Sequence, residues 1–222
     1  MTQPNPKSDS GMQSTDYTLE PDTLVWWTTP ILNRQLPDSQ AINKELKEIV
    51  LSRAATKITA KKSDDSGWNS DDDFLTWDGP AIAQLQAWIV AAFQDVTKVT
   101  ASGQVYGGKI MLKAWANLSR RGDYSLVRTH PSSVWSGVYC IDAGDPPTTD
   151  RPNSGMIELL DPRAGAEMTV VPGQPFGRAK LIQPQAGQIT VFPSWLKHTV
   201  HPYWGEGDRI MIVFNIGIAS IP

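Results

Sequence analysis

The sequence has few of the residues from which metal sites and disulfides are usually built. Its 222 residues include one cysteine, Cys140, and three histidines. A single cysteine excludes a disulfide within the chain and a zinc site made of several cysteines. With three histidines and one cysteine, any transition-metal site is tightly constrained.

Charged residues and long apolar runs are also scarce. Charged residues make up 19% of the chain, the net charge is −3, and the lysines and arginines are scattered, which predicts no nucleic-acid partner. No apolar run is long enough to span a membrane. The polar N-terminus has no apolar signal-peptide core, so we expect a cytoplasmic protein with no membrane partner.

Glycine, proline and tryptophan are plentiful instead, with 17, 17 and 9 residues respectively. Many turn residues and aromatics with few charges are typical of a β-rich fold with irregular connections. Residues 1–20 are rich in Ser, Pro, Asp and Gln, which predicts a disordered tail. The length then favours a single domain over residues 21–222.

Apolar residues recur at helical spacing only in the first half of this domain. After Pro37-Asp38-Ser39, the spacing predicts a helix over 38–55. After Pro80, a continuous apolar stripe predicts a second helix over 80–97. The helical part of the domain therefore covers about 38–97.

The pattern changes to short alternating strands over about 104–218. The strand-like stretches include KIMLKAW, VWSGVYCID, MIELLDP, AKLIQP and QITVFP. No helical pattern separates them, which predicts an antiparallel sandwich or barrel. Helices followed by strands indicate an α+β fold, in which the N-terminal helices pack on one sheet of a jelly roll.

Two of the three histidines lie beside predicted strands. His130 follows a strand in LVRTHPSS, and His198 precedes one in SWLKHTVHP. Iron(II) held by two histidines and one carboxylate keeps three positions open, enough for a 2-oxo acid and dioxygen. The alternatives are structural: His198 as a surface histidine, and His130 as the cap of a turn before Pro131.

Arg209 follows His198 by eleven positions and can grip a carboxylate through two parallel hydrogen bonds. In a simple hairpin Arg209 would pair near Trp204, six residues from His198, or about 20 Å along the strand. That is too far for one small co-substrate. If both residues serve one site, the chain must cross to the facing sheet between them, as in a jelly roll. Otherwise Arg209 is an ordinary edge-strand charge.

A family resemblance rests on four motifs, HPSSVWSGVY, IELLDPR, PQAGQITVFPSWLKHTVHP and DRIMIVFN. Together they resemble the 2-oxoglutarate and iron(II)-dependent oxygenases of bacteria and phages. The resemblance covers about residues 24–217 and is most specific in the last hundred. It implies a double-stranded β-helix, or cupin-like, core that uses Fe(II), 2-oxoglutarate and dioxygen.

The resemblance also implies roles for individual residues. His198 is similar to the distal iron ligand, His130 to a member of the proximal ligand pair, and Arg209 to the residue that pairs with the tail of 2-oxoglutarate. Related oxygenases place His-x-Asp or His-x-His at the proximal strand, whereas this chain has Arg128-Thr129-His130. The nearest plausible carboxylate is Asp161, which is assigned as the third metal ligand; its alternative role is that of a turn residue.

Two further residues are assigned to the co-substrate on the same basis. Asn117 and Tyr139 are candidate hydrogen-bond donors to 2-oxoglutarate, with packing within the strands as the alternative. A further departure from the family is Met211, because a serine often stands two residues after the arginine.

The resemblance predicts a 2-oxoglutarate-dependent dioxygenase that hydroxylates a C–H bond of a small molecule or peptide. Dioxygen and 2-oxoglutarate would be consumed, and succinate and carbon dioxide released. Two alternatives stay open. One is a catalytically inactive jelly-roll binding module, and the other is a cupin-type metal enzyme that does not use 2-oxoglutarate.

Overall fold

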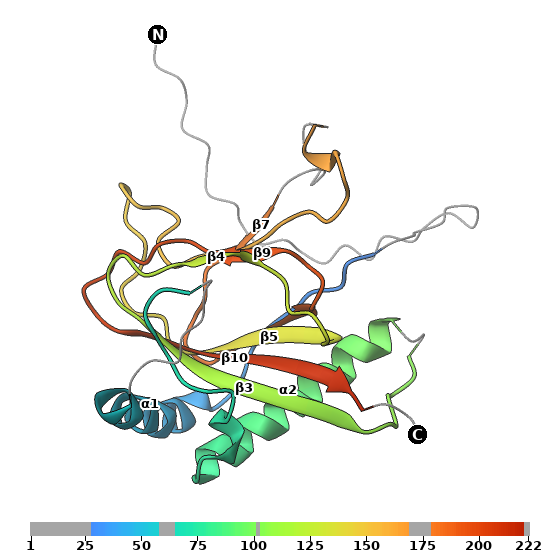
Figure 1. Cartoon of the computed structure of the whole chain (residues 1–222), viewed down its shortest axis with the longest axis horizontal. Coiled ribbons are helices and arrows are strands. Elements are labelled where there is room, and N and C mark those ends of the chain that lie inside the picture. Colours follow the sequence, from blue (N-terminus) through green and yellow to red (C-terminus); the bar gives the residue numbers. More distant parts are fainter. Residues whose placement is uncertain (1–27, 58–64, 101–102, 169–178, 220–222) are drawn as a thin grey trace.

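The computed structural model describes residues 28–57, 65–100, 103–168 and 179–219. The N-terminal tail expected over residues 1–20 lies outside them. The described residues form two antiparallel sheets that face each other, with two long helices on the far side of the larger sheet (Figure 1). This is the α+β jelly-roll arrangement expected from the sequence.

The two helices are α1, Ser39–Thr56, and α2, Pro80–Thr100. Both begin and end close to the predicted positions. Proline is well suited to the first position of α2, where no intrahelical partner for an N–H exists. No helix in the described part of the chain is long and apolar enough to cross a bilayer. The apolar stripe of α2 is buried against the larger sheet, and it comprises Ile82, Leu85, Ile89, Phe93 and Val96.

The larger sheet has six strands and the smaller has four. The order in the larger sheet is β1 (Leu32–Gln35), β8 (Gln188–Pro193), β5 (Trp135–Asp142), β10 (Arg209–Ile218), β3 (Ile110–Ser119) and β2 (Trp68–Asn69). The order in the smaller sheet is β4 (Ser125–Arg128), β9 (His198–Val200), β6 (Ile157–Leu159) and β7 (Lys180–Ile182). Two short 3₁₀ helices, η1 (Phe74–Thr76) and η2 (Ala166–Met168), lie in the connections.

Strand β10 separates the two halves of the core. It pairs with β3 on one side and with β5 on the other. Because side chains alternate along a strand, Ile210, Ile212 and Phe214 pack in the core that contains the helices, while Met211 packs in the core between the sheets. The position of a residue in β10 therefore decides whether its side chain meets the helices or the interior of the jelly roll.

The chain changes sheets between His198 and Arg209. His198 begins β9 in the smaller sheet, and Arg209 begins β10 in the larger one. Figure 1 shows these strands in different layers. The predicted corner between the two sheets is confirmed, and it allows residues eleven positions apart to approach one interior space from opposite walls.

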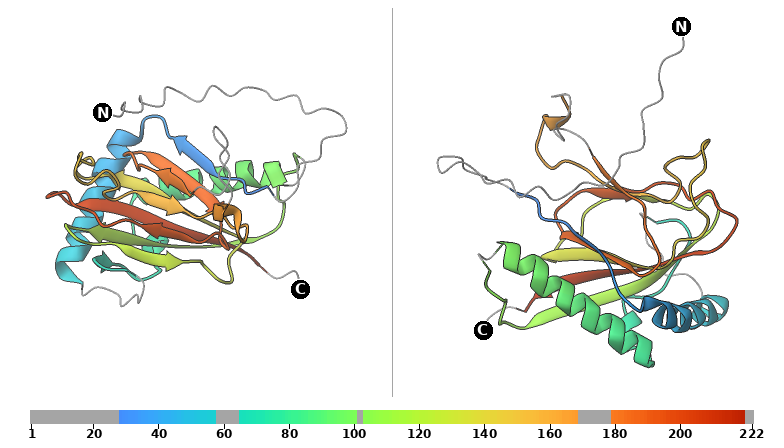
Figure 2. Two further views of the ribbon diagram at one scale, coloured as in Figure 1. Left: turned by 90° about the horizontal axis from the view of Figure 1, so that it is seen from above. Right: turned by 180° about the vertical axis from the view of Figure 1, so that it is seen from behind.

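One edge of the jelly roll is bridged by the segment that precedes η1. Asp65 makes an isolated bridge to Ser125 of the smaller sheet, and Trp68–Asn69 pairs with β3 of the larger sheet. Gly67 turns between these two contacts with φ +85°, a left-handed conformation that favours glycine. The segment thus contacts both sheets at the edge opposite to strands β1 and β7 (Figure 2).

Replacing Gly137 with alanine is expected to destabilise the fold. Gly137 lies in β5 opposite Phe214, and an added Cβ would lie 2.5 Å from the backbone carbonyl oxygen of Thr190 as well as against the Phe214 ring. Overpacking of this kind costs about 1–3 kcal/mol in the free energy of unfolding, which a urea titration measures. Gly107→Ala is the matched control, because no heavy atom lies within 4 Å of its added Cβ. Equal stability of the two variants would contradict the expected clash.

The thiol of Cys140 is expected to be inert in the native protein. Cys140 is fully buried between the sheets, and burial raises the pKa of the thiol to about 12. The thiolate is the reactive form, so at pH 8 we expect Ellman's reagent to react at least about a hundredfold more slowly with native than with urea-unfolded protein. The chain has no other cysteine, so Cys140→Ser gives the blank. Rapid stoichiometric reaction of the native protein would contradict this burial.

Candidate functional site

A narrow cavity lies between the two sheets, and its polar lining contains most of the residues singled out from the sequence. Its volume is about 30 Å³, which is room for about one water molecule. The remaining lining residues are apolar. The polar lining residues are Asn117, Ser125, Arg128, His130, His198 and Arg209.

His198 lines this cavity from β9 and is 5% exposed. Its Nδ1 lies 2.9 Å from the carbonyl oxygen of Leu196. A carbonyl oxygen only accepts, so Nδ1 carries the proton and Nε2 carries the lone pair that a metal ion requires. Burial lowers the pKa of His198 to about 4, so the imidazole is neutral at physiological pH.

His130 reaches the same cavity from the connection that follows β4. Its backbone N–H donates to the carbonyl oxygen of Ser194 at 2.9 Å, which fixes this connection against the end of β8. The ring centroids of His130 and His198 lie 5.0 Å apart, with an angle of 33° between the ring planes. The structure therefore brings together the two histidines predicted to bind a metal, although they are 68 positions apart in the chain.

Arg209 enters the cavity from the opposite sheet and is 2% exposed. Its Nη2 donates to the carbonyl oxygen of Gly155 at 3.1 Å. Burial lowers the pKa of its guanidinium. No carboxylate among the described residues forms an ion pair with it. A buried guanidinium without a counter-ion is costly, so this end of the cavity favours an anion.

Of the two residues assigned to the co-substrate, the structure places one in the cavity and the other outside it. Asn117 does line the cavity; its Nδ2 donates to Asn69 at 3.1 Å and its Oδ1 accepts from Ser119 at 2.8 Å. Tyr139 does not line it. Its ring packs in the helix-side core and its hydroxyl donates to Asn43 on α1, so its assignment to 2-oxoglutarate is corrected to a role in packing α1 on the sheet.

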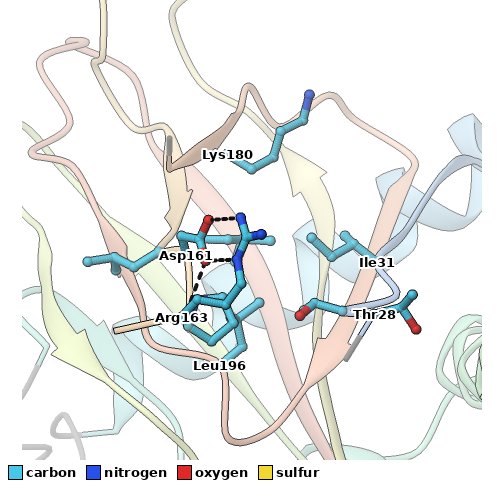
Figure 3. A pocket seen from close by; sticks show the side chains of 10 residues that line it. Thr28, Ile31, Asp161, Arg163, Lys180 and Leu196 are labelled. Atoms are coloured by element: carbon cyan, nitrogen blue, oxygen red, sulfur yellow. Dashed lines mark hydrogen bonds and ion pairs between the residues drawn. The ribbon is translucent and has the colours of Figure 1, made fainter. Parts of the chain in front are cut away.

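Asp161 is likewise placed away from the two histidines. It lines a different pocket of about 340 Å³, where its carboxylate accepts two hydrogen bonds from the guanidinium of Arg163 (Figure 3). It also accepts one from the backbone N–H of Arg163. This is the turn role that the sequence offered as the alternative. The structure therefore does not bring Asp161 to the predicted metal site.

No pattern in the sequence indicates the carboxylate that does lie near His198. Asp65 is 2% exposed at its side chain and forms an ion pair with Arg128, which lines the cavity. Its negative charge acts on His198, although weakly compared with burial. Asp65 belongs to a polar loop some 60 residues before β4, and such a loop is usually solvated. No periodic pattern links the two segments.

The described residues fit part of a metal site. Two imidazoles face one cavity, and the Leu196 carbonyl sets the tautomer of His198, as metal-binding histidines require. Within residues 28–57, 65–100, 103–168 and 179–219, no three His, Cys, Asp or Glu side chains are grouped closely enough to hold a metal ion. His130 and His198 therefore stay the two candidate protein ligands in this part of the chain.

Comparison with solved structures shows the fold. A prolyl-4-hydroxylase from Pseudomonas putida is 16% identical, with a TM-score of 0.59 over 87% of this chain and 95% of the other. HygX from Streptomyces hygroscopicus, solved with nickel and 2-oxoglutarate bound, is 13% identical, with a TM-score of 0.55 over 86% and 83%. A prolyl hydroxylase from Trichoplax adhaerens, in complex with a peptide fragment, is 11% identical, with a TM-score of 0.55 over 85% and 83%.

One family model matches part of the sequence. None of the curated proteins compared with the chain matches it. Residues 113–215, however, match the family model described as "Putative 2OG-Fe(II) oxygenase". This region contains His130, His198 and Arg209, the residues that meet in the cavity. This region therefore resembles the 2OG-Fe(II) oxygenases, and the chain as a whole shares the fold of the solved structures compared above.

Proposed function

We propose that the chain is an Fe(II)/2-oxoglutarate-dependent dioxygenase that hydroxylates a C–H bond of a small molecule or peptide. Its reaction would consume dioxygen and convert 2-oxoglutarate to succinate and carbon dioxide. The observation that carries the proposal is Arg209, a buried cation with no carboxylate partner among the described residues, in the same cavity as His130 and His198.

In this proposal each residue has a defined task. His130 and His198 bind the iron, and the carbonyl oxygen of Leu196 holds the proton on Nδ1 of His198 so that Nε2 stays available. Arg209 fixes the carboxylate of 2-oxoglutarate that lies farther from the metal. The iron supplies the oxidation, while the protein positions the reactants and excludes water through apolar lining residues such as Phe192 and Val213.

The proposed substrate class rests on two solved structures that share the fold. HygX has been solved with hygromycin B, a small molecule, and the Trichoplax enzyme with a peptide. Both share the fold of this chain at low identity. We therefore propose a small-molecule or peptide substrate for this chain.

One observation favours a second candidate, a catalytically inactive binding module. In the part of the chain that the structure describes, the two histidines are not joined by a grouped carboxylate. An inactive module would keep the fold and the cavity without holding stoichiometric metal. A cupin-type enzyme that does not use 2-oxoglutarate would hold metal and yield no succinate.

Wild-type protein is expected to bind Fe(II) and form succinate. Anaerobic addition of Fe(II) and 2-oxoglutarate should give the weak visible absorption band of their chelate, and admission of air should release succinate, measured by mass spectrometry. The absence of both signals, with no stoichiometric metal in protein purified without chelators, would reject the proposal in favour of the inactive module.

His198→Ala is expected to abolish this band, because it removes one of the two ligands proposed among the described residues. Loss of a metal ligand commonly costs more than the 10–100-fold in affinity that follows from loss of its supporting contacts. His201→Ala is the matched control. His201 is half-buried outside the cavity, with its Nε2 2.7 Å from a carboxylate oxygen of Glu158. An undiminished band in His198→Ala would contradict its assignment.

Asp161→Asn is expected to keep the band at full strength. Its carboxylate pairs with Arg163 in a separate pocket, so its loss removes an ion pair and leaves the histidines in place. The same anaerobic titration measures the effect. Loss of the band in Asp161→Asn would restore Asp161 as the third ligand.

A further inference from the structure

Arg128 is the second guanidinium of the cavity. It ends β4, where its backbone lies opposite His198 of β9. Its side chain is 12% exposed and lines the cavity, and its Nη1 donates to Asp65. The same Asp65 oxygen accepts from the hydroxyl of Ser125. Arg128 is thus held in place on one side only, by a buried carboxylate.

The other edge of the Arg128 guanidinium is not used. Its Nε is buried and has no hydrogen-bond partner among the described residues. Nε–H and one Nη–H point in parallel along this edge, the geometry that binds both oxygens of a carboxylate. A buried donor without an acceptor is costly, by about 1–3 kcal/mol. An oxyanion at this edge would remove that cost.

The charges around the cavity also favour a bound anion. Two guanidiniums line it, from opposite sheets, and none of the described carboxylates lines it. Asp65 balances one of these positive charges through Arg128. The charge of Arg209 is left without a balancing protein carboxylate in the described part of the chain.

We propose that Arg128 is an additional anion-binding residue, and that Arg128 and Arg209 together hold the two carboxylates of one dicarboxylate, so that it binds even to the metal-free protein. The inference rests on the proposed function only in taking 2-oxoglutarate as that dicarboxylate. In this structure the cavity is too narrow for a five-carbon dicarboxylate. Binding therefore requires lining side chains to move, and Met211, unbranched and adaptable, is the one best suited to do so.

The first test needs no variant. The full chain, in excess EDTA, is titrated with 2-oxoglutarate in a calorimeter, and then with 2-oxopentanoate, which has the same carbon chain but lacks the second carboxylate. We expect saturable one-to-one binding of 2-oxoglutarate and at least about tenfold weaker binding of 2-oxopentanoate, because one charge-assisted contact is lost. No binding of 2-oxoglutarate without metal, or equal binding of the two acids, would overturn the proposal.

The second test assigns the contact to Arg128. Arg128→Gln should weaken metal-free binding of 2-oxoglutarate by about tenfold or more. It should weaken the binding of 2-oxopentanoate as well, because the carboxylate that this acid keeps is the one assigned to Arg128. Arg34→Gln is the matched control, since Arg34 pairs with Asp95 at the surface and does not line the cavity. Unchanged 2-oxoglutarate binding by folded Arg128→Gln would overturn the assignment. If that variant does not fold, equal binding of the two acids by wild-type protein still overturns the two-arginine site.

These outcomes are distinguishable from a failure of the proposed function. Metal-free binding of 2-oxoglutarate with no succinate formed in the presence of Fe(II) and air would reject the dioxygenase activity and keep the two-arginine site. Succinate formation with no metal-free binding would keep the dioxygenase and reject the two-arginine site.

Discussion

The structure depends on the alternation of side chains along β10. This strand lies inside the larger sheet, so both of its faces are buried and neither can be left to solvent. One face completes the core with the helices, through residues such as Phe214. The other carries Arg209, Met211 and Val213 into the cavity. A shift of one residue in the pairing would exchange the two faces and place a guanidinium against the helices. The long register with β3 and β5 holds it in place.

Placing charge in this interior has an energetic cost that the fold does not fully offset. Arg128 has Asp65 as a partner, whereas Arg209 has a single backbone carbonyl. Functional sites are commonly the places where local stability is sacrificed. The neutral, buried state of His198 belongs to the same arrangement, since a third positive charge there would add repulsion. The cavity thus carries excess positive charge, which favours the binding of an anion.

Much of the architecture could be predicted because its signals are local. Helical spacing predicted α1 and α2, and the distance between His198 and Arg209 predicted a change of sheet on the condition that both residues serve one site. The sequence did not allow us to predict which face of β5 each side chain lies on. Its sequence, VWSGVYCID, is buried on both sides, so no polar alternation shows that Tyr139 meets the helices. Asp65 was missed for another reason: its contacts with Ser125 and Arg128 are entirely long-range and leave no trace in spacing.

The segment that precedes η1, with Asp65, Gly67 and Trp68–Asn69, limits how the helical part and the sheets of such proteins can be recombined. The family-matched region, 113–215, holds both arginines of the cavity, but Asp65 precedes it. The helical part and the β-sheets are therefore not interchangeable modules. A chimera that combined these sheets with the helical part of a relative would inherit Arg128 without its counter-ion. Recombination at that boundary would alter the charge of the cavity while leaving every cavity-lining residue unchanged.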